Sequence, residues 1–240
     1  MNITAGDMHF QLLNKKLKAC KDKTITIDNC MGQRYIGAGR SSGDIIINGT
    51  PGNALGAYLD GSNITVNGSA QDATGDTMNE GTITINGSSG DATGYAMRGG
   101  KIFVKDDAGY RAGIHMKSYM DKVPVLVIGG KAGSFLGEYQ AGGYIVVLGL
   151  GYEDEQIVGY FCGTGMHGGK IFLRTNNYPA DLPKQVKAEE AAKADLSEIE
   201  GYVKEYCKKF GADKDEIMNH KFYVLTPDTK NPYKRLYTPN

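Results

Sequence analysis

The sequence contains no tryptophan, only four cysteines and seven prolines, and no excess of charge of either sign. Its 27 basic and 27 acidic residues cancel, which argues against binding to nucleic acid or to a membrane surface through a basic excess. The cysteines Cys20, Cys30, Cys162 and Cys207 form no Cys-x-x-Cys pair. The sequence therefore supports neither a disulfide scaffold nor a zinc or iron–sulfur site, and we expect reduced thiols.

Long apolar runs are missing as well. No segment approaches the roughly 20 consecutive apolar residues of a membrane-spanning helix. The opening residues also lack the basic and then apolar pattern of a signal peptide. We expect a cytoplasmic protein that has no membrane partner.

Glycine, by contrast, is abundant, with 34 of the 240 residues, and it recurs at a fixed interval. Five glycines follow one another at steps of 19 residues, and two more continue the series at longer steps: Gly37, Gly56, Gly75, Gly94, Gly113, Gly137 and Gly163. Methionines recur three residues after three of these glycines, and asparagines recur eight residues before three of them: Met78, Met97 and Met116, and Asn48, Asn67 and Asn86. Short alternating apolar runs keep the same step, which indicates stacked structural repeats.

Each alternating run predicts a short strand with one buried face, and each is followed by a turn signal. No stretch between the runs is suited to a crossover helix. The pattern therefore predicts a mainly β fold, a single-stranded right-handed parallel β-helix of about seven coils over residues 24–175. In such a stack the methionines form a buried column, and the asparagines form an amide ladder. A β-sandwich or a left-handed six-residue helix does not hold a 19-residue interval.

The two ends differ from the repeats. Residues 1–23 predict a short capping helix from Phe10, Leu13, Leu17 and Cys20, with Asp7 as its N-cap. Residues 176–240 predict a linker, an amphipathic helix and a C-terminal extension. Apolar residues at helical spacing define that helix, and Gly211 ends it: Leu196, Ile199, Val203, Tyr206 and Phe210.

Few residues are candidates for chemistry. Asp72 and Asp91 share one phase of the repeat, and stacked carboxylates could bind a cation or act as an acid–base pair; an aspartate in a turn more commonly bonds its own backbone. We interpret His115, His167, Cys162 and Arg111 as structural, with Arg111 pointing into a widened coil or pairing with Asp91 or Asp106. We predict no catalytic, cofactor-binding or metal-binding residue and a structural role for the seven repeat glycines. The acidic loop of Glu153, Asp154 and Glu155 is the candidate partner contact.

Several stretches resemble the glycine-repeat domain at the C-terminus of the glutamate synthase large (α) subunit, in the form that archaea and some anaerobic bacteria encode as a separate polypeptide. The resemblance rests on GTPGNALGAYLDG (49–61), GEYQAGGYIVVLG (137–149), GMHGGKIFL (165–173) and FYVLTPDTKNPYKRLY (222–237). It implies a non-catalytic domain that braces glutaminase and flavin-barrel parts, which convert glutamine and 2-oxoglutarate to glutamate. FMN and iron–sulfur clusters are then expected only in those partner subunits.

Two other functions remain open. The same repeat is similar to the C-subunit of formylmethanofuran dehydrogenase, which implies a structural role in a different complex. A carbohydrate-active β-helix enzyme is the third alternative, and it would need a row of exposed carboxylates along one groove. Self-association is a further option that the sequence leaves open.

Overall fold

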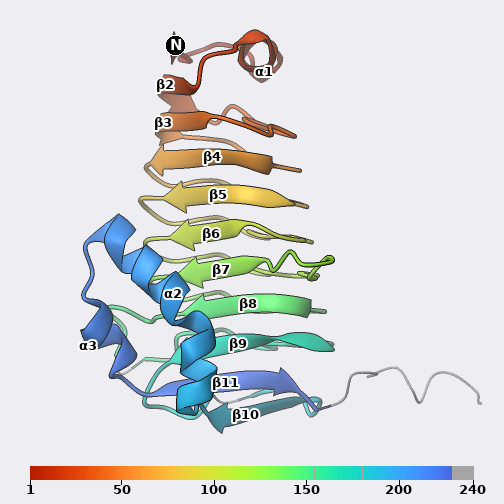
Figure 1. The fold of residues 1–240 in the computed structure, drawn as a ribbon, viewed down its shortest axis with the longest axis vertical. Helices are drawn as coiled ribbons and strands as arrows, with labels where there is room; N and C mark the ends of the chain where they lie inside the picture. Colours follow the sequence, from red (N-terminus) through yellow and green to blue (C-terminus); the bar gives the residue numbers. More distant parts are fainter. Residues whose placement is uncertain (154, 180, 229–240) are drawn as a thin grey trace, which may run out of the picture.

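The chain folds mainly into one β-sheet of eleven strands, accompanied by three helices among the described residues. The computed structural model describes residues 1–153, 155–179 and 181–228. The strands lie one above another along the long axis of the molecule, with α1 at one end and α2 against one side (Figure 1).

The elements follow one another along the chain with the bounds β1 Asn2–Thr4, α1 Phe10–Ala19, β2 Thr24–Met31, β3 Asp44–Thr50, β4 Asp60–Asn67, β5 Glu80–Ile85, β6 Lys101–Val104, β7 Val125–Ile128, β8 Ala141–Val147, β9 Gly168–Arg174, β10 Val186–Glu190, α2 Lys193–Phe210, α3 Lys214–Met218 and β11 Phe222–Pro227. Strands β1 to β9 are parallel neighbours in chain order.

The predicted single-stranded right-handed parallel β-helix is wrong. The described strands form one open, mixed sheet, in which β11 lies antiparallel between β9 and β10. The prediction extended the equal spacing of the early strands and had no signal for a returning strand. β11 can return because it has two apolar faces: Phe222 and Val224 face the helical layer, and Tyr223 and Leu225 face the main core.

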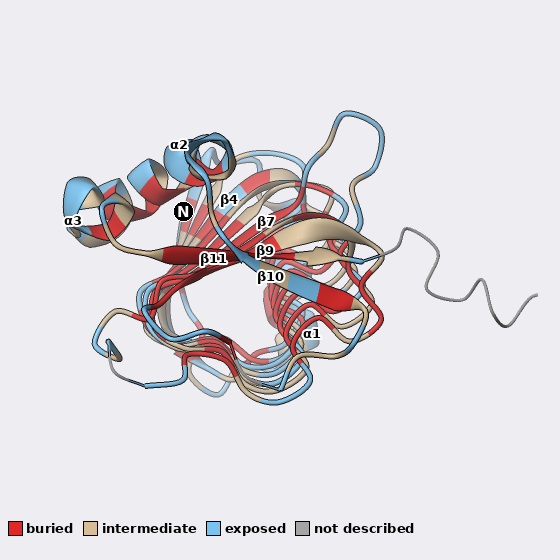
Figure 2. Cartoon of the chain, turned by 90° about the horizontal axis from the view of Figure 1, so that it is seen from below, coloured by how far each residue is buried: buried red, intermediate tan, exposed pale blue. Residues whose placement is uncertain are grey.

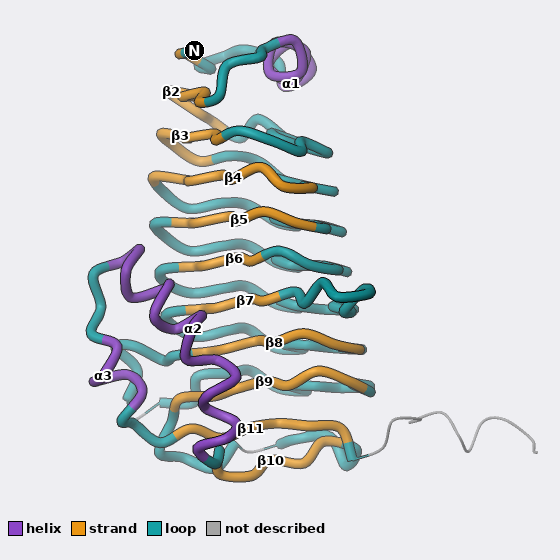
Figure 3. The backbone as a smooth tube through the Cα atoms, viewed as in Figure 1, coloured by secondary structure: helices purple, strands orange, loops and turns teal. Residues whose placement is uncertain are grey.

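From β3 to β6 the register mostly pairs residues that lie 19 positions apart, as in Asp44 with Asn63 and Ile64 with Ile83, and the step lengthens to 24 between β6 and β7 and to 26 between Tyr144 and Lys170. The amide ladder is confirmed: Asn67 Nδ2 donates to Asn48 Oδ1 at 2.7 Å, and Asn86 Nδ2 donates to Asn67 Oδ1 at 3.1 Å. The turns between the strands also stack, through parallel bridges that link Ala70, Ser89, Ala108, Ala132 and Val158 in order. Figure 3 shows these turns as loops of similar course that lie one above another.

The apolar core has two parts. The larger part lies between the sheet and the stacked turns, and both carry buried residues (Figure 2). It contains Met78, Met97 and Met116, all fully buried. The smaller part lies between the other face of the sheet and α2, where Phe103 and Phe172 meet Tyr206. The turns therefore stay in place because they cover one face of the sheet, while α2 covers part of the other.

The helices at the two ends form where their apolar spacing predicts. In α1, Leu13 and Leu17 are buried in the main core, but His9 is the N-cap in place of the predicted Asp7. In α2, Gly211 is the left-handed C-cap, as predicted, and Ile199 and Val203 are buried. Tyr206 also donates its hydroxyl to the Lys105 carbonyl at 2.9 Å, which ties α2 to the turn after β6.

Candidate partner-binding surface

Exposed aromatic side chains gather on the stacked turns between β5 and β9. We call this surface the aromatic turn face and define it by Tyr95, Tyr110, Arg111, His115, Phe135, Tyr139, Tyr160 and Phe161. Tyr110, Tyr160 and Phe161 are each more than half exposed. Large exposed aromatic and arginine side chains in one patch are typical of the central part of a protein–protein interface.

The rings of the aromatic turn face contact one another from turn to turn. The centroids of His115 and Tyr139 lie 5.1 Å apart in a stacked arrangement, and Tyr95 meets His115 edge-on at 5.8 Å. In a second row, Phe135 stacks on Phe161 at 5.0 Å. These contacts pre-order much of the surface, because the ring of an adjacent turn supports each of Tyr95, His115, Tyr139, Phe135 and Phe161.

The backbone of the turns places these side chains in register. His115, Tyr139, Phe135 and Phe161 all have positive φ values, between 54° and 63°. That conformation costs roughly 1–2 kcal/mol for a residue other than glycine. It is held by hydrogen bonds between turns: the His115 N–H donates to Glu138 O, and the Phe135 N–H donates to Tyr160 O, both at 2.8 Å.

Arg111 belongs to this surface, and the prediction that it pairs with Asp91 or Asp106 or points into a coil is wrong. Its guanidinium lies over the Phe135 ring at 4.7 Å, and its Nε contacts Glu138 Oε2 at 3.3 Å. The side chain is half exposed. Arg111 thus adds a cation to an otherwise aromatic patch while the ring supports its stem.

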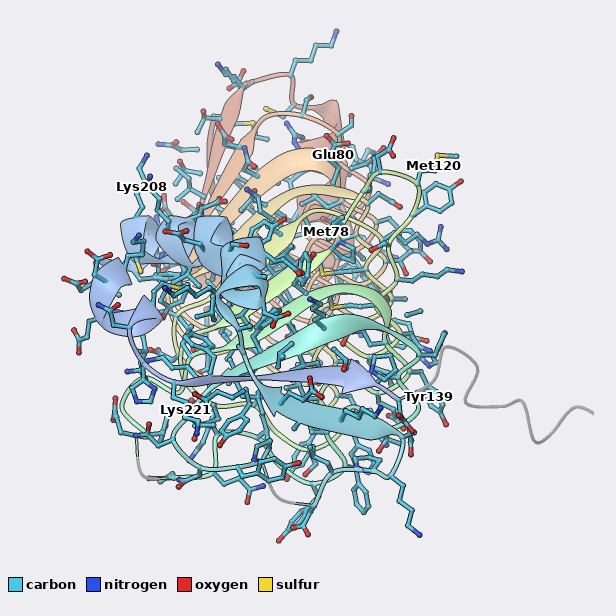
Figure 4. All side chains as sticks on the ribbon, turned by 60° about the horizontal axis from the view of Figure 1, so that its bottom comes forward. Met78, Glu80, Met120, Tyr139, Lys208 and Lys221 are labelled. Atoms are coloured by element: carbon cyan, nitrogen blue, oxygen red, sulfur yellow. The ribbon has the colours of Figure 1, made fainter. Side chains whose placement is uncertain are left out.

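A hairpin at residues 118–123 closely follows His115 of the aromatic turn face in the sequence. Tyr119 and Lys122 pair in an antiparallel bridge, and Lys122 Nζ reaches Glu80 Oε2 at 2.9 Å and Asp60 Oδ1 at 3.7 Å. The hydrogen bond to Glu80 raises the pKa of Lys122. At the tip Met120 is 84% exposed and projects away from the ribbon (Figure 4). The hairpin therefore presents an apolar tip on an anchored base.

Asp72 and Asp91 bond to backbone, but to the backbone of the next turn and not to their own. Asp72 Oδ1 accepts the Asp91 N–H at 2.9 Å, and Asp91 Oδ1 accepts the Tyr110 N–H at 2.8 Å. Asp107 does the same for the Lys131 N–H at 2.9 Å. Each carboxylate thus links its turn to the next one. Across the residues that the structure describes, no three His, Cys, Asp or Glu side chains converge as a metal site.

The remaining candidate residues are a buried cysteine and two histidines. Complete burial raises the pKa of the Cys162 thiol to about 12, so it is not a nucleophile at neutral pH. His167 Nδ1 contacts the Gly165 carbonyl at 3.2 Å. His115 stacks on Tyr139 in the aromatic turn face.

The acidic loop is held by its own chain. Lys131 Nζ pairs with Glu155 Oε2 at 3.4 Å and lies 4.2 Å from the Tyr152 ring centroid. The Gly151 N–H donates to Glu153 Oε1 at 3.3 Å, and backbone hydrogen bonds lower the Glu153 pKa. Asp154 lies outside the described residues. The role of this loop as a partner contact stays a prediction.

The aromatic turn face was missed in the sequence, although a signal for it was present. Two residues after the repeat glycines come His115 and Tyr139, and two residues before them come Arg111, Phe135 and Phe161. Their shared phase places them at one level of successive turns. The signal is a change of residue type at one position of the repeat. Two residues before the repeat glycine, alanine in three early repeats gives way to arginine or phenylalanine in the later ones.

A family model for the GXGXG motif matches residues 13–228, which is most of the chain. The chain belongs to the GXGXG motif family. A curated relative, an uncharacterised protein of Methanocaldococcus jannaschii, is 45% identical over 251 aligned positions that cover 99% of this chain and 96% of the relative.

The fold is also similar to a solved structure, the formyltransferase/hydrolase complex FhcABCD of Methylorubrum extorquens in complex with methylofuran. The match has a TM-score of 0.66 at 24% identity and covers 87% of this chain and 75% of that chain. At this identity the match shows a shared fold. Separately, no helix among the described residues is both long and apolar enough to span a membrane.

Proposed function

We propose that the chain is a non-catalytic structural subunit that braces the glutaminase and flavin-barrel subunits of a glutamate synthase-like complex. The observation that carries this proposal is the aromatic turn face, a pre-ordered and exposed patch in a chain of the GXGXG motif family. On this proposal FMN and the iron–sulfur cluster belong to the partner subunits.

The physical basis is rigidity combined with exposed aromatic surface. Nine parallel strands stacked by hydrogen bonds form a stiff support, since hydrogen bonds and parallel bridges also link successive turns. Partner binding would cover Tyr160 and Phe161, which are otherwise 63% and 54% exposed. Rings held in place before binding lose little conformational freedom on association, which favours affinity.

The experiment co-expresses the tagged chain with the glutaminase and flavin-barrel subunits of the same organism and measures complex formation by size-exclusion chromatography at micromolar concentration. We expect co-elution, and at least about tenfold weaker binding for Tyr139→Ser/Phe161→Ser, because aromatic anchors dominate such interfaces. Tyr178→Ser is the matched control, since Tyr178 is 63% exposed but lies outside the aromatic turn face. Separate elution of all components would refute the proposal.

A second candidate is a structural subunit of a formyltransferase or formylmethanofuran dehydrogenase type of complex. The match to a chain of the formyltransferase/hydrolase complex, at a TM-score of 0.66, favours it. The same co-elution assay with the subunits of such a complex separates the two. Co-elution with these subunits, and not with glutaminase and flavin-barrel subunits, would replace the first proposal with the second.

A further inference from the structure

Helix α1 lies at the end of the sheet opposite to β10 (Figure 1). A groove is lined by residues of α1, by the segment that follows it and by the turn at residues 35–43. It consists of two adjoining cavities with volumes of about 730 and 420 Å³. Both cavities are lined by Asn14, Lys18, Tyr35 and Ala38, so they lie side by side. We call this feature the α1 groove. Its size falls in the range of small-molecule sites.

One end of the α1 groove is cationic, being lined by Lys18, Lys21, Lys23 and Arg40. None of these four side chains forms an ion pair with any described residue. The single carboxylate in the lining, Asp22, is engaged by the N-terminal ammonium group at 2.8 Å. Lysines elsewhere, such as Lys101, Lys122 and Lys170, pair with carboxylates. Uncompensated positive charge is thus concentrated in a concave part of a chain whose net charge is zero.

Arg40 is fixed at this end by two backbone carbonyl groups. Its Nη1 donates to Leu17 O at 3.1 Å, and its Nε donates to Ser42 O at 2.9 Å. These bonds connect the last turn of α1 to the turn at residues 41–43. They leave further N–H groups of the guanidinium for an anion in the groove.

The turn at Ser41, Ser42 and Gly43 adds uncharged donors. Within the described part of the chain, the N–H groups of these three residues donate to no acceptor, and neither serine hydroxyl is hydrogen-bonded. All three residues line the cavity. Successive free backbone N–H groups in a turn form a concavity suited to phosphate oxygens, and adjacent cations strengthen it.

The second cavity of the α1 groove has two aromatic rings in its lining, together with Lys15 and Lys18. The ring centroids of Phe10 and Tyr35 lie 6.0 Å apart, and Tyr35, which lines both cavities, is 47% exposed. The Arg34 guanidinium lies 4.8 Å from the Phe10 centroid, which supports that ring. An exposed ring such as Tyr35 accepts the flat face of a heterocyclic base by stacking.

We propose that the α1 groove binds a nucleotide, with its phosphates at Lys21, Lys23, Arg40 and the Ser41–Gly43 turn and its base against Tyr35. The arrangement favours a nucleotide over an acidic peptide because the free N–H donors of one short turn and the Tyr35 ring line the same cavity. The proposal is independent of the aromatic turn face and of the proposed function, since the two surfaces share no residue.

Isothermal titration calorimetry on the full chain tests the proposal with ADP, inorganic phosphate and adenosine as separate ligands. We expect ADP to bind more tightly than phosphate or adenosine. Lys21→Gln/Lys23→Gln should raise the Kd for ADP at least about tenfold, as expected for lost charge-assisted hydrogen bonds. The matched control is Lys16→Gln/Lys208→Gln, which removes the same charge from two exposed lysines outside the groove.

A further variant tests the aromatic ring separately from the proposed phosphate donors. Tyr35→Ala should weaken ADP binding and leave phosphate binding unchanged. The proposal is overturned if ADP at millimolar concentration produces no binding heat, or if the control variant loses as much affinity as the groove variant. It is also overturned if poly-glutamate binds and ADP does not, which would assign the groove to an acidic protein segment. Circular dichroism of each variant confirms that folding is retained.

Discussion

The role of the repeat glycines can be tested most directly at Gly75. This residue has a φ of +71°, and a Cβ added there would overlap Cδ1 of Ile102, which is fully buried. Gly39 has a similar φ of +66°, but a Cβ there would have nothing within 4 Å. Alanine at these two positions therefore experiences the same backbone conformation in different packing.

The expected losses of stability come from two effects, the positive φ and the overlap with Ile102. A positive φ costs an alanine roughly 1 kcal/mol, and the fold already accepts it at Ala54 and Ala73. Gly39→Ala should therefore lower the free energy of unfolding by about 1 kcal/mol. Gly75→Ala adds an overpacking term of roughly 1–3 kcal/mol, because Ile102 cannot move towards solvent, for a total of about 2–4 kcal/mol.

Urea unfolding followed by circular dichroism measures both variants, and a double mutant isolates the contact. Ile102→Val removes Cδ1 and alone should cost about 1 kcal/mol. In the Gly75→Ala background the same change should be neutral or stabilising, because it removes the overlapping atom. Equal losses for Gly75→Ala and Gly39→Ala, or no coupling between Gly75 and Ile102, would refute the packing role of this glycine.

Three further outcomes are expected. Gln140→Met should raise the free energy of unfolding by about 1 kcal/mol in urea titrations, because the buried Gln140 Oε1 accepts no hydrogen bond within the described residues. A clear loss of stability would instead show that the hydrogen bonds donated by Gln140 Nε2 contribute more than the unpaired Oε1 costs. In the native protein at pH 8, a thiol reagent should modify the partly exposed Cys20 and spare Cys162, whose pKa burial raises to about 12; rapid modification of both would contradict the burial. The hydrogen bonds that Lys170 and the Ala192 N–H donate to Asp195 lower the pKa of its carboxyl group. The stabilising contribution of Asp195 is therefore present above the unfolded carboxyl pKa and is lost as pH falls through the folded value. Urea titrations at pH 7 and pH 3 should show a smaller pH dependence of stability for Asp195→Asn than for the natural chain.

Much of the local structure could be read from the sequence. Apolar spacing located α1 and α2, and the recurrence of Asn48, Asn67 and Asn86 predicted their hydrogen-bonded ladder. These predictions worked because each depends on contacts between residues at a constant separation. The N-cap of α1 was wrong by two residues because His9 and Asp7 are both able to cap, and only the course of the chain after β1 selects one.

The candidate surfaces were less accessible to sequence reasoning. The aromatic turn face joins residues from turns whose separations differ, such as Phe135 and Phe161, so the lengthened steps obscured their common phase. The α1 groove joins Lys21 and Lys23 to the turn after Gly39, and no motif connects these segments in the sequence. Both surfaces arise from distances between side chains, which composition and spacing do not encode.

By itself, the sequence determined that the early strands stack at an interval of 19 residues, because similar side chains that recur at that interval, such as Ile64 and Ile83, pack against one another. Only the tertiary structure decided that the stack belongs to one open mixed sheet, because β11 could bury its two apolar faces only by returning between β9 and β10. The tertiary structure also decided which exposed rings and cations meet, since their contacts depend on how neighbouring turns rest on one another.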